Sequence, residues 1–357
     1  MIPAGPGPRF EWRGVMLDVA RHFFAPADVK RFIDAISRYR LNRLHLHLTD
    51  DQGWRIEIKS WPRLAGVGGA TAVGGGRGGF YTQEEYEELV RYAAERGVTV
   101  VPEVDVPAHV NAALVAYPEL APAGVIPAPY TGSDVGFSTL DTQSETVERF
   151  VADVVREVAD LTPGPYLHIG GDEAAVTPTD DYVRFVSRVC DLVHEHGKTP
   201  IGWEEIAKAP LPAGTIVQHW KDEELARAAV RRGARLIMSP APRTYLDQKY
   251  DSSTRLGFDW AGYVRVRDAY DWDPGTLIDG VTETDVLGIE APVWSETLET
   301  LAEVEEMVFP RLLGTAELAW SQARQDWDDF RTRVAAEGAE LARMGVNVFR
   351  SPEIPWD

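Results

Sequence analysis

The sequence predicts an α/β protein built as a single (β/α)8 TIM barrel, and two observations support that prediction. Short β-rich runs alternate with longer amphipathic helical patterns along nearly the whole chain, which is typical of a parallel sheet. There are eight such β-rich runs, the number of strands that closes a barrel. The length of 357 residues alone leaves one large domain or two small ones open. We expect a linker or N-terminal extension over residues 1–10 and one barrel domain over residues 11–357.

The expected strands and helices follow from the spacing of apolar residues. Strands are expected at residues 14–20, 43–49, 98–106, 166–171, 199–203, 215–220, 235–239 and 287–294. Amphipathic helices are expected at residues 27–40, 83–97, 146–160, 180–197 and 222–233. Thr82 and Glu85 fit a capping box that opens the second helix. The single cysteine, Cys190, falls in the fourth helix, where we expect it to be buried, and one thiol excludes an intramolecular disulfide.

The composition is that of an acidic globular protein. A formal net charge of −20 opposes the attraction that drives binding to nucleic acids and to anionic membrane surfaces, so we expect neither as a partner. The N-terminal segment has neither the basic region nor the apolar core of a signal peptide. We therefore expect either a cytoplasmic protein or a secreted one whose signal is absent from this chain. The glycine-rich segment 66–79 lacks the Gly-Lys-Ser/Thr of a phosphate loop, and we expect a flexible surface loop there.

Polar and aromatic residues gather where the expected strands end. In a barrel of this kind the active site lies at the C-terminal ends of the strands, so residues placed there are functional candidates. In chain order they are Arg21, Asp50, Asp51, Asp105, His109, Asp172, Glu173, Trp203, Trp220, Tyr245, Asp247, Trp294 and Glu296.

The sharpest motif is HIGGDE, which runs from His168 to Glu173. Two glycines let the backbone turn tightly after the strand, and the adjacent carboxylates Asp172 and Glu173 raise the pKa of one of them by like-charge repulsion. One carboxylate then stays ionised while the other carries a proton, as general acid catalysis of glycosidic cleavage requires. Sequence neighbours are poorly placed on opposite faces of a sugar, and the substrate's own 2-acetamido carbonyl could instead attack the anomeric carbon.

Other residues leave alternatives open. His45 and His47 form a His-x-His pair on a strand, with which metal-dependent hydrolases also begin a metal site. Strands five to eight end mainly in Trp and Tyr, which do not suit a divalent cation, so we expect no metal and interpret both histidines as interior hydrogen-bonded residues. Asp51 is expected to be a hydrogen-bonding loop residue. The 11 tryptophans either pack the core or form flat walls for sugar rings, and we expect core or surface positions for Trp12, Trp61, Trp320, Trp327 and Trp356.

A family resemblance accompanies these motifs. HIGGDE, with GVMLDVARHF, NRLHLHLTDDQGWRIEI, PEVDVPAH, SPAPRTYLDQKY and APVWSET, resembles the catalytic domain of the bacterial family 20 glycoside hydrolases, the β-N-acetylhexosaminidases. The resemblance runs from about Arg9 to the C-terminus. Many relatives carry a small α/β domain before the barrel, and the sequence leaves open whether one precedes this chain. The resemblance implies retaining exo-hydrolysis of terminal β-linked N-acetylglucosamine or N-acetylgalactosamine from an oligosaccharide or glycoconjugate, without a metal or organic cofactor.

The resemblance also implies roles for individual residues. Glu173 is implied as the general acid/base, Asp172 as the carboxylate that holds the acetamido NH, and Tyr245 as the donor to the acetamido oxygen. The acetamido methyl is expected to lie among Trp203, Trp260 and Trp294, with Trp220 nearby. The hydroxyls of the terminal sugar are expected to bind Arg21, Asp247 and Glu296. A supporting layer is expected from Asp50 paired with His109 behind Glu173, and from His168 and Asp105 beneath the site.

Two other classes of function remain as alternatives at this stage. A catalytically silent barrel can use the same aromatic pocket as a lectin, although the intact Asp172, Glu173 and Tyr245 argue against it. A metal-dependent hydrolase would lose activity on chelation. The sequence carries no signal for oligomeric state, for the choice between the two sugar epimers, or for a chitin fragment, glycoprotein glycan or glycolipid as the natural substrate.

Overall fold

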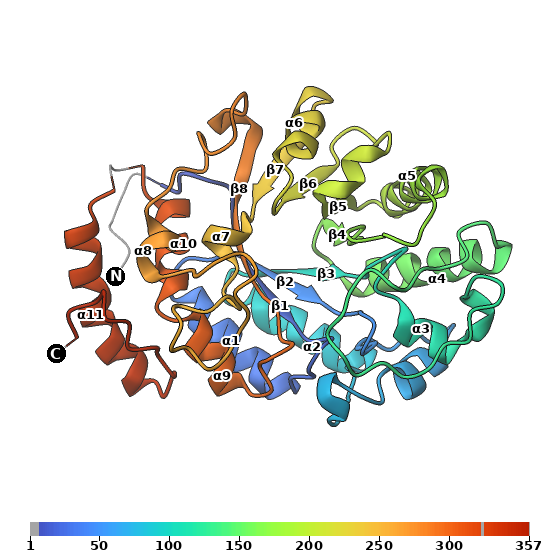
Figure 1. Ribbon diagram of the computed structural model, residues 1–357, viewed down its shortest axis with the longest axis horizontal. Coiled ribbons are helices and arrows are strands. Elements are labelled where there is room, and N and C mark those ends of the chain that lie inside the picture. The colour runs from blue at the N-terminus through green and yellow to red at the C-terminus, as the bar shows by residue number, and fades with distance from the viewer. Residues whose placement is uncertain (1–6, 323–324, 357) are drawn as a thin grey trace.

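The computed structural model describes residues 7–322 and 325–356, and its centre is a closed barrel of eight parallel strands in sequence order (Figure 1). β1 pairs with β8 to close the barrel, with register partners from Trp12 and Gly288 to Leu17 and Val293. The predicted fold class and all eight predicted strands are confirmed. The strands are β1 (Trp12–Asp18), β2 (Arg43–His47), β3 (Thr99–Glu103), β4 (Tyr166–His168), β5 (Thr199–Trp203), β6 (Ile216–His219), β7 (Arg235–Met238) and β8 (Val286–Val293).

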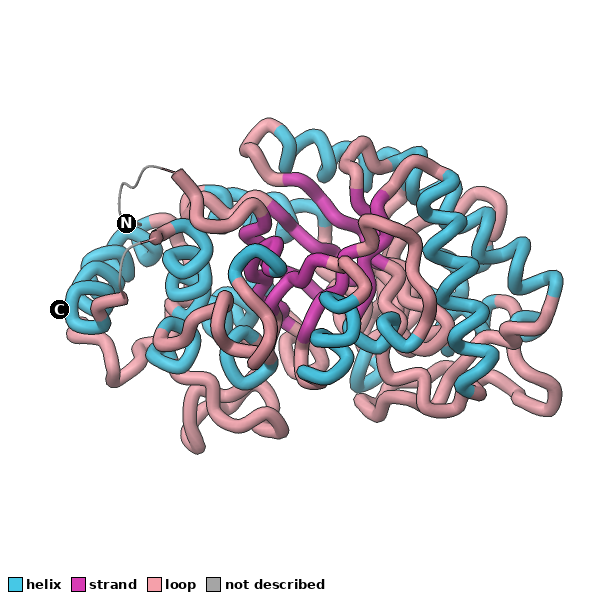
Figure 2. Tube along the Cα trace, turned by 90° about the horizontal axis from the view of Figure 1, so that it is seen from above, coloured by secondary structure: helices cyan, strands magenta, loops and turns pink. Residues whose placement is uncertain are grey.

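Helices enclose the strands on the outside (Figure 2). The five helices predicted from periodicity are confirmed as α1 (Pro26–Ser37), α2 (Gln83–Ala94), α4 (Glu145–Leu161), α5 (Thr179–Glu195) and α6 (Glu223–Arg231). The remaining α-helices are α3 (Asn111–Ala116), α7 (Ala241–Thr244), α8 (Val266–Tyr270), α9 (Leu301–Val308), α10 (Arg311–Trp320) and α11 (Trp327–Arg343). The short helices are η1 (Leu64–Gly68), η2 (Val73–Gly75), η3 (Pro118–Leu120), η4 (Glu204–Lys208) and η5 (Glu283–Asp285).

Two local predictions can be checked directly. The Thr82 hydroxyl accepts from the Glu85 amide and the Glu85 carboxylate accepts from the Thr82 amide, so the capping box that opens α2 is confirmed. Cys190 is fully buried on α5, as predicted. Between β5 and β6 the chain forms only the short helix η4 instead of a full α-helix. The expected linker over residues 1–10 stays a prediction, because residues 1–6 lie outside the described part of the chain.

The barrel interior is apolar at one level and polar at the next. Side chains from six strands pack together in one layer: Trp12, Val101, Ile201, Ile216, Ile237 and Leu287. Toward the C-terminal ends of the strands the interior residues are ionisable or amide side chains, all with at most 1% of their surface exposed: His45, His47, Glu103, His168, Gln218 and Glu290. Barrel interiors are usually filled by branched apolar residues, so this polar layer marks the side of the barrel that supports the site.

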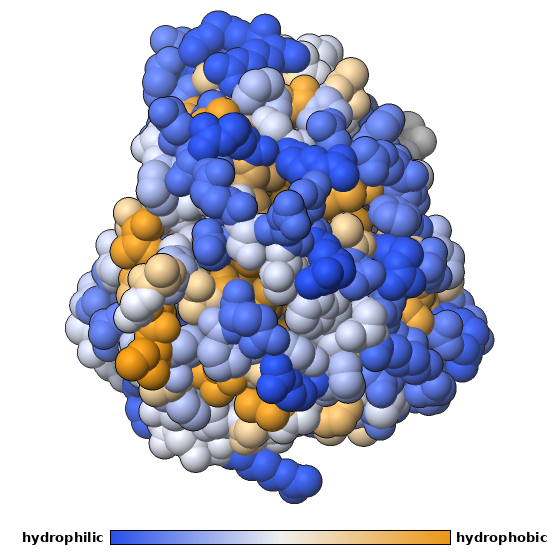
Figure 3. Space-filling view, turned by 90° about the vertical axis from the view of Figure 1, so that its right-hand side faces the viewer, coloured by the Kyte–Doolittle hydropathy of each residue, from blue (hydrophilic) through white to orange (hydrophobic). Residues whose placement is uncertain are grey.

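The outer surface fits the acidic composition. The face drawn in Figure 3 is largely hydrophilic, and its apolar residues form separate patches instead of one continuous area. Among the described helices, none combines the length and apolar character that a membrane span requires.

The glycine-rich segment 66–79 is partly anchored by a buried arginine. The Arg55 guanidinium is fully buried and donates to the carbonyl oxygens of Gly69, Thr71 and Gly79. It also donates to the carbonyls of Val19 and Ala20 after β1, so it ties the segment to the edge of the site. The segment is therefore exposed only at Gly66, Val67 and Ala70 and at a tip formed by residues 74–77.

We predict that Arg55→Met destabilises the protein, because it leaves several buried carbonyl oxygens without a donor. The free energy of unfolding is expected to fall by roughly 3 kcal/mol or more. Urea unfolding followed by tryptophan fluorescence measures this change. Arg149→Met, on the exposed face of α4, is the matched control and should change the free energy of unfolding by less than about 0.5 kcal/mol. Equal stability of the two variants would contradict the anchoring role of Arg55.

Candidate active site

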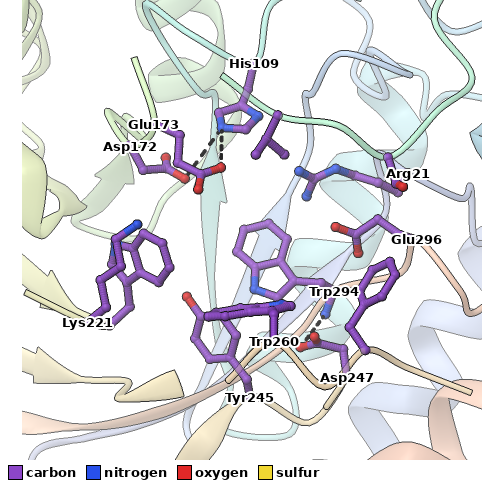
Figure 4. A pocket seen from close by; sticks show the side chains of 14 residues that line it. Arg21, His109, Asp172, Glu173, Lys221, Tyr245, Asp247, Trp260, Trp294 and Glu296 are labelled. Carbon is purple, nitrogen blue, oxygen red and sulfur yellow. Dashed lines mark hydrogen bonds and ion pairs between the residues drawn. The ribbon is translucent and has the colours of Figure 1, made fainter. Parts of the chain in front are cut away.

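A cavity of about 460 Å³ opens at the C-terminal ends of the strands (Figure 4). Ten of the residues predicted from the sequence line it: Arg21, His109, Asp172, Glu173, Trp220, Tyr245, Asp247, Trp260, Trp294 and Glu296. Four predicted residues lie behind the lining and are buried: Asp50, Asp105, His168 and Trp203. The structure thus brings the predicted set together around one cavity.

The segment after β4 directs both carboxylates toward the cavity. Gly170 and Gly171 have φ of +65° and +92°, and Glu173 has φ of +47°. A Cβ on Gly170 would lie 1.9 Å from Asp105 Oδ1, so this position accepts only glycine without rearrangement. The Gly171 amide donates to Asp105 Oδ1 at 3.0 Å. His168 and Asp105 hold this turn, because the Gly170 amide also donates to His168 Nδ1 at 3.0 Å.

Asp172 and Glu173 share one cationic neighbour. His109 Nε2 lies 3.7 Å from Asp172 Oδ2 and 3.6 Å from Glu173 Oε2 (Figure 4). Burial, and then the adjacent Asp172 carboxylate, raise the pKa of Glu173 above its usual value. Burial lowers the pKa of His109, but Asp50 and the nearby acids outweigh it and raise that pKa well above the usual value. Glu173 is therefore suited to hold and deliver a proton beside a charged imidazolium.

Asp50 connects His109 to Arg21. Asp50 Oδ1 lies 3.2 Å from His109 Nδ1, and its Oδ2 lies 2.9 Å from Arg21 Nη2. Burial favours the neutral acid, yet Arg21 and His109 outweigh it and hold the pKa of Asp50 well below its usual range. Arg21 also stacks 4.9 Å from the centre of the Trp294 ring. One guanidinium thus orients both the supporting carboxylate and an aromatic wall. Asp51 makes loop hydrogen bonds to the Asn111 amide and the Ser138 hydroxyl, as expected.

Aromatic rings form the opposite wall. The Tyr245 ring centre lies 5.7 Å from that of Trp260 and 6.3 Å from those of Trp220 and Trp294. Trp260 is 56% exposed and forms the rim. Trp203 is 1% exposed and is not among the lining residues; its ring centre lies 5.8 Å from that of Trp294, and its Nε1 donates to Glu103. Such rings supply flat apolar surfaces for a sugar and its substituents.

Several buried polar atoms of the residues that line the cavity have no hydrogen-bond partner within the protein. They are Arg21 Nε, His109 Nε2, Asp172 Oδ1 and Glu296 Oε2. Burial, and then Glu296, raise the pKa of Asp247 to about 7. Because buried polar groups are normally paired, convergent unpaired ones are typical of groups that bind a polar ligand.

Sequence reasoning missed four residues that line the cavity: Ser133, Val135, Lys221 and Phe258. Lys221 directly follows Trp220 after β6, so the rule that located the other candidates could have found it. Its Nζ lies 3.7 Å from the Trp220 ring centre. The other three come from the long connections after β3 and β7, whose path across the barrel is not encoded in a local pattern.

Buried acids and histidines also bring potential cation ligands together. His45, Glu103 and His168 form one such group, and Asp50, Asp51 and His109 form another, each with ligand atoms within 4.8 Å. Hydrogen bonds within the protein already engage several of these side chains. Glu103 pairs with His47 and Trp203, and His45 Nδ1 lies 2.8 Å from Glu290. The interpretation of His45 and His47 as interior hydrogen-bonded residues is confirmed, and the expected absence of a metal stays a prediction.

These features define a class of protein. A (β/α)8 barrel that holds an acid with a raised pKa next to a second carboxylate, beside a cavity with aromatic walls and unpaired polar groups, is a glycoside hydrolase. The family model of the glycosyl hydrolase family 20 catalytic domain matches residues 10–182 and 175–323. The chain belongs to glycosyl hydrolase family 20.

Individual relatives agree with this assignment. A β-N-acetylhexosaminidase from Cellulomonas fimi is 48% identical over 98% of this chain and 71% of its own length. A β-hexosaminidase from Porphyromonas gingivalis is 37% identical over 95% of this chain and 47% of its own length. The solved GH20 β-N-acetylhexosaminidase of Streptomyces coelicolor superimposes with a TM-score of 0.96 at 51% identity, covering 98% of this chain and 72% of that one.

We predict that Gly170→Ala lowers activity as well as stability, because the new methyl would collide with Asp105 and move the turn that carries Asp172 and Glu173. We expect kcat/KM to fall at least about 10-fold and the free energy of unfolding to fall by roughly 1–3 kcal/mol. Gly197→Ala is the matched control, since Gly197 has a similar φ of +71° with open space around it. If both variants lost stability equally and kept full activity, the positional argument would be wrong.

Proposed function

We propose that this pocket removes terminal, non-reducing β-linked N-acetylglucosamine or N-acetylgalactosamine with net retention, by substrate-assisted catalysis through an oxazolinium intermediate. The observation that carries the proposal is the placement of Asp172 and Glu173 side by side on one turn, both within 4 Å of His109 Nε2. N-acetylglucosamine is bound in the solved β-hexosaminidase variant of Streptomyces plicatus, which is 52% identical, and this supports the choice of sugar.

The carboxylate arrangement favours the substrate as nucleophile. A retaining enzyme with its own nucleophile holds two carboxyl groups about 5–5.5 Å apart across the anomeric carbon, and family 20 departs from that scheme by substrate assistance. Asp172 and Glu173 instead approach the same imidazole nitrogen from one turn. In the proposed reaction the 2-acetamido oxygen attacks the anomeric carbon while the glycosidic C–O bond breaks.

Glu173 moves the protons of both steps. It donates its proton to the departing glycosidic oxygen as the oxazolinium ring forms. Water then attacks the anomeric carbon, Glu173 takes the water proton, and the ring opens to restore the acetamido group. Asp172 accepts from the acetamido NH and balances the positive charge of the intermediate. The scheme uses neither a metal ion nor an organic cofactor.

The other lining residues bind the sugar. The Tyr245 hydroxyl donates to the acetamido oxygen, and the acetamido methyl lies between Trp260 and Trp294, with Trp220 beside them and Trp203 behind Trp294. Arg21, Asp247 and Glu296 bind the ring hydroxyls. Burial, and then Glu296, raise the pKa of Asp247 to about 7, so near neutral pH Asp247 can donate as well as accept a hydrogen bond to a hydroxyl; burial also raises the pKa of Glu296.

We predict that Glu173→Gln loses activity mainly on substrates with a poor leaving group. On a substrate with a poor leaving group, such as the β-linked disaccharide of N-acetylglucosamine, kcat should fall about 10²- to 10⁴-fold, because the leaving oxygen no longer receives a proton. On the 2,4-dinitrophenyl glycoside, whose leaving group departs without protonation, the formation of the intermediate should be nearly unaffected. Steady-state kinetics on both substrates measure the difference. Near-complete activity on the disaccharide would refute the role of Glu173.

We also predict that the enzyme requires the 2-acetamido group. It should release nitrophenol from 4-nitrophenyl N-acetyl-β-glucosaminide and almost none from 4-nitrophenyl β-glucoside, because the latter carries no internal nucleophile. Comparable rates on both would contradict substrate assistance. Binding of the first compound without any release of nitrophenol would instead indicate a sugar-binding protein.

A further inference from the structure

We propose that His47, which does not line the cavity, is a positioning residue for Glu173. It joins the charged interior of the barrel to the Asp50–His109 pair. The inference deepens the proposed function and rests on it.

His47 lies on β2 with both ring nitrogens engaged, and it is fully buried. Its Nδ1 lies 2.5 Å from Glu103 Oε2, on the neighbouring strand β3. Its Nε2 lies 2.8 Å from Asp50 Oδ2, just past the end of β2. The imidazole therefore spans the distance between the central carboxylate of the barrel and the carboxylate that supports the site.

The two oxygens of Asp50 have separate partners, so His47 helps to set the orientation of the whole carboxylate. Oδ2 is held by His47 and by Arg21, whereas Oδ1 accepts from the Asp51 amide and faces His109 Nδ1. With Oδ2 held from two sides, the carboxylate plane is fixed and Oδ1 stays directed at His109. The far nitrogen of His109 is then held 3.6 Å from Glu173 Oε2. Each contact orients the next group along this path. A displacement of the His47 ring therefore changes the position of His109 relative to Glu173, the proton donor.

The charges along this path alternate. Carboxylates Glu103 and Asp50 flank His47, and Asp50 and Glu173 flank His109. The charged or titratable groups that face His47 from neighbouring elements are Asp18 at the end of β1, Arg21 in the segment after it, Glu103 on β3 and Asp105 just past β3. Those that face Glu173 are Asp172, His109, Lys221 and Arg21. Replacing a cationic His47 by a neutral residue makes the surroundings of Glu173 more negative, so the pKa of Glu173 rises.

Two substitutions test the contacts of the two His47 ring nitrogens separately. The amide nitrogen of His47→Asn can replace Nδ1 and keep the bond to Glu103, but it cannot reach Asp50. The longer His47→Gln can place its nitrogen near the position of Nε2 and keep the bond to Asp50. We expect His47→Asn to lower kcat on the disaccharide at least about 10-fold and to leave the rate on the 2,4-dinitrophenyl glycoside within about 3-fold. His47→Gln should retain more of the disaccharide activity.

The pH profile gives a second readout. The glycosylation step needs protonated Glu173, so kcat/KM falls as pH rises through its pKa. In both variants this alkaline limb should move to higher pH, by up to about one pH unit if the lost charge acts through an effective dielectric of about 20. A purely structural role for His47 would change stability without moving this limb.

His45 is the matched control, two residues earlier on the same strand. It is equally buried and lies 3.0 Å from Glu103 Oε2 and 2.8 Å from Glu290 Oε1, and no contact joins it to Asp50. His45→Asn should lower the melting temperature by an amount comparable to His47→Asn. Its ratio of disaccharide rate to dinitrophenyl rate should stay at the wild-type value. Its alkaline limb should move less than in the His47 variants, because no contact joins the charge of His45 to Asp50.

The rate ratio is taken within one preparation, so it does not depend on the folded fraction. If His47→Asn yields no folded protein, His47→Gln compared with His45→Gln supplies the alkaline-limb comparison. The proposal is overturned if the His47 and His45 variants have the same rate ratio and the same alkaline limb. A wild-type enzyme that releases no sugar from either substrate would overturn the proposed function instead, so the two failures are distinguishable.

Discussion

A single ionised carboxylate at the centre of the barrel constrains the rest of this structure. Glu103 has no exposed surface, and a buried charge is tolerated only when it is paired and hydrogen-bonded. The charged or hydrogen-bonded histidines His47, His168 and His45 hold the pKa of Glu103 well below its usual value against the effect of burial, and Trp203 adds a hydrogen bond. These partners come from β2, β4 and β5, so the charge requires strands on both sides of it to be in register.

The need to pair the buried charge of Glu103 also makes the site rigid. From Glu103 the contacts continue through His47 to Asp50, and from Asp50 to both Arg21 and His109. Most catalytic groups of barrel enzymes sit on loops, but here the supporting contacts begin inside the barrel. Trp203 is part of this arrangement as well, because the indole that backs the aromatic wall also donates to Glu103.

The features that could be predicted from the sequence are those that depend on a few consecutive residues. Strand periodicity located every strand, and the position of Asp172 and Glu173 after two glycines identified the carboxylate pair before any geometry was available. Sequence reasoning missed Val135 and Phe258, which reach the cavity from long connections. It also placed Trp203 among the cavity walls, whereas the ring lies behind Trp294. A strand-end position predicts the correct end of the barrel but not the depth of the side chain within it.

The sequence by itself determined the barrel and the family and pointed to Asp172 and Glu173 as the candidate carboxylates, because the apolar spacing and the HIGGDE turn lie in consecutive residues. The tertiary structure decided in which direction the pKa of each acid is shifted. Asp50 is kept ionised by Arg21 and His109, while Glu173 and Asp247 have raised pKa values. Those differences arise from burial and from neighbours on other strands, and the distances between such groups exist only once the barrel has closed.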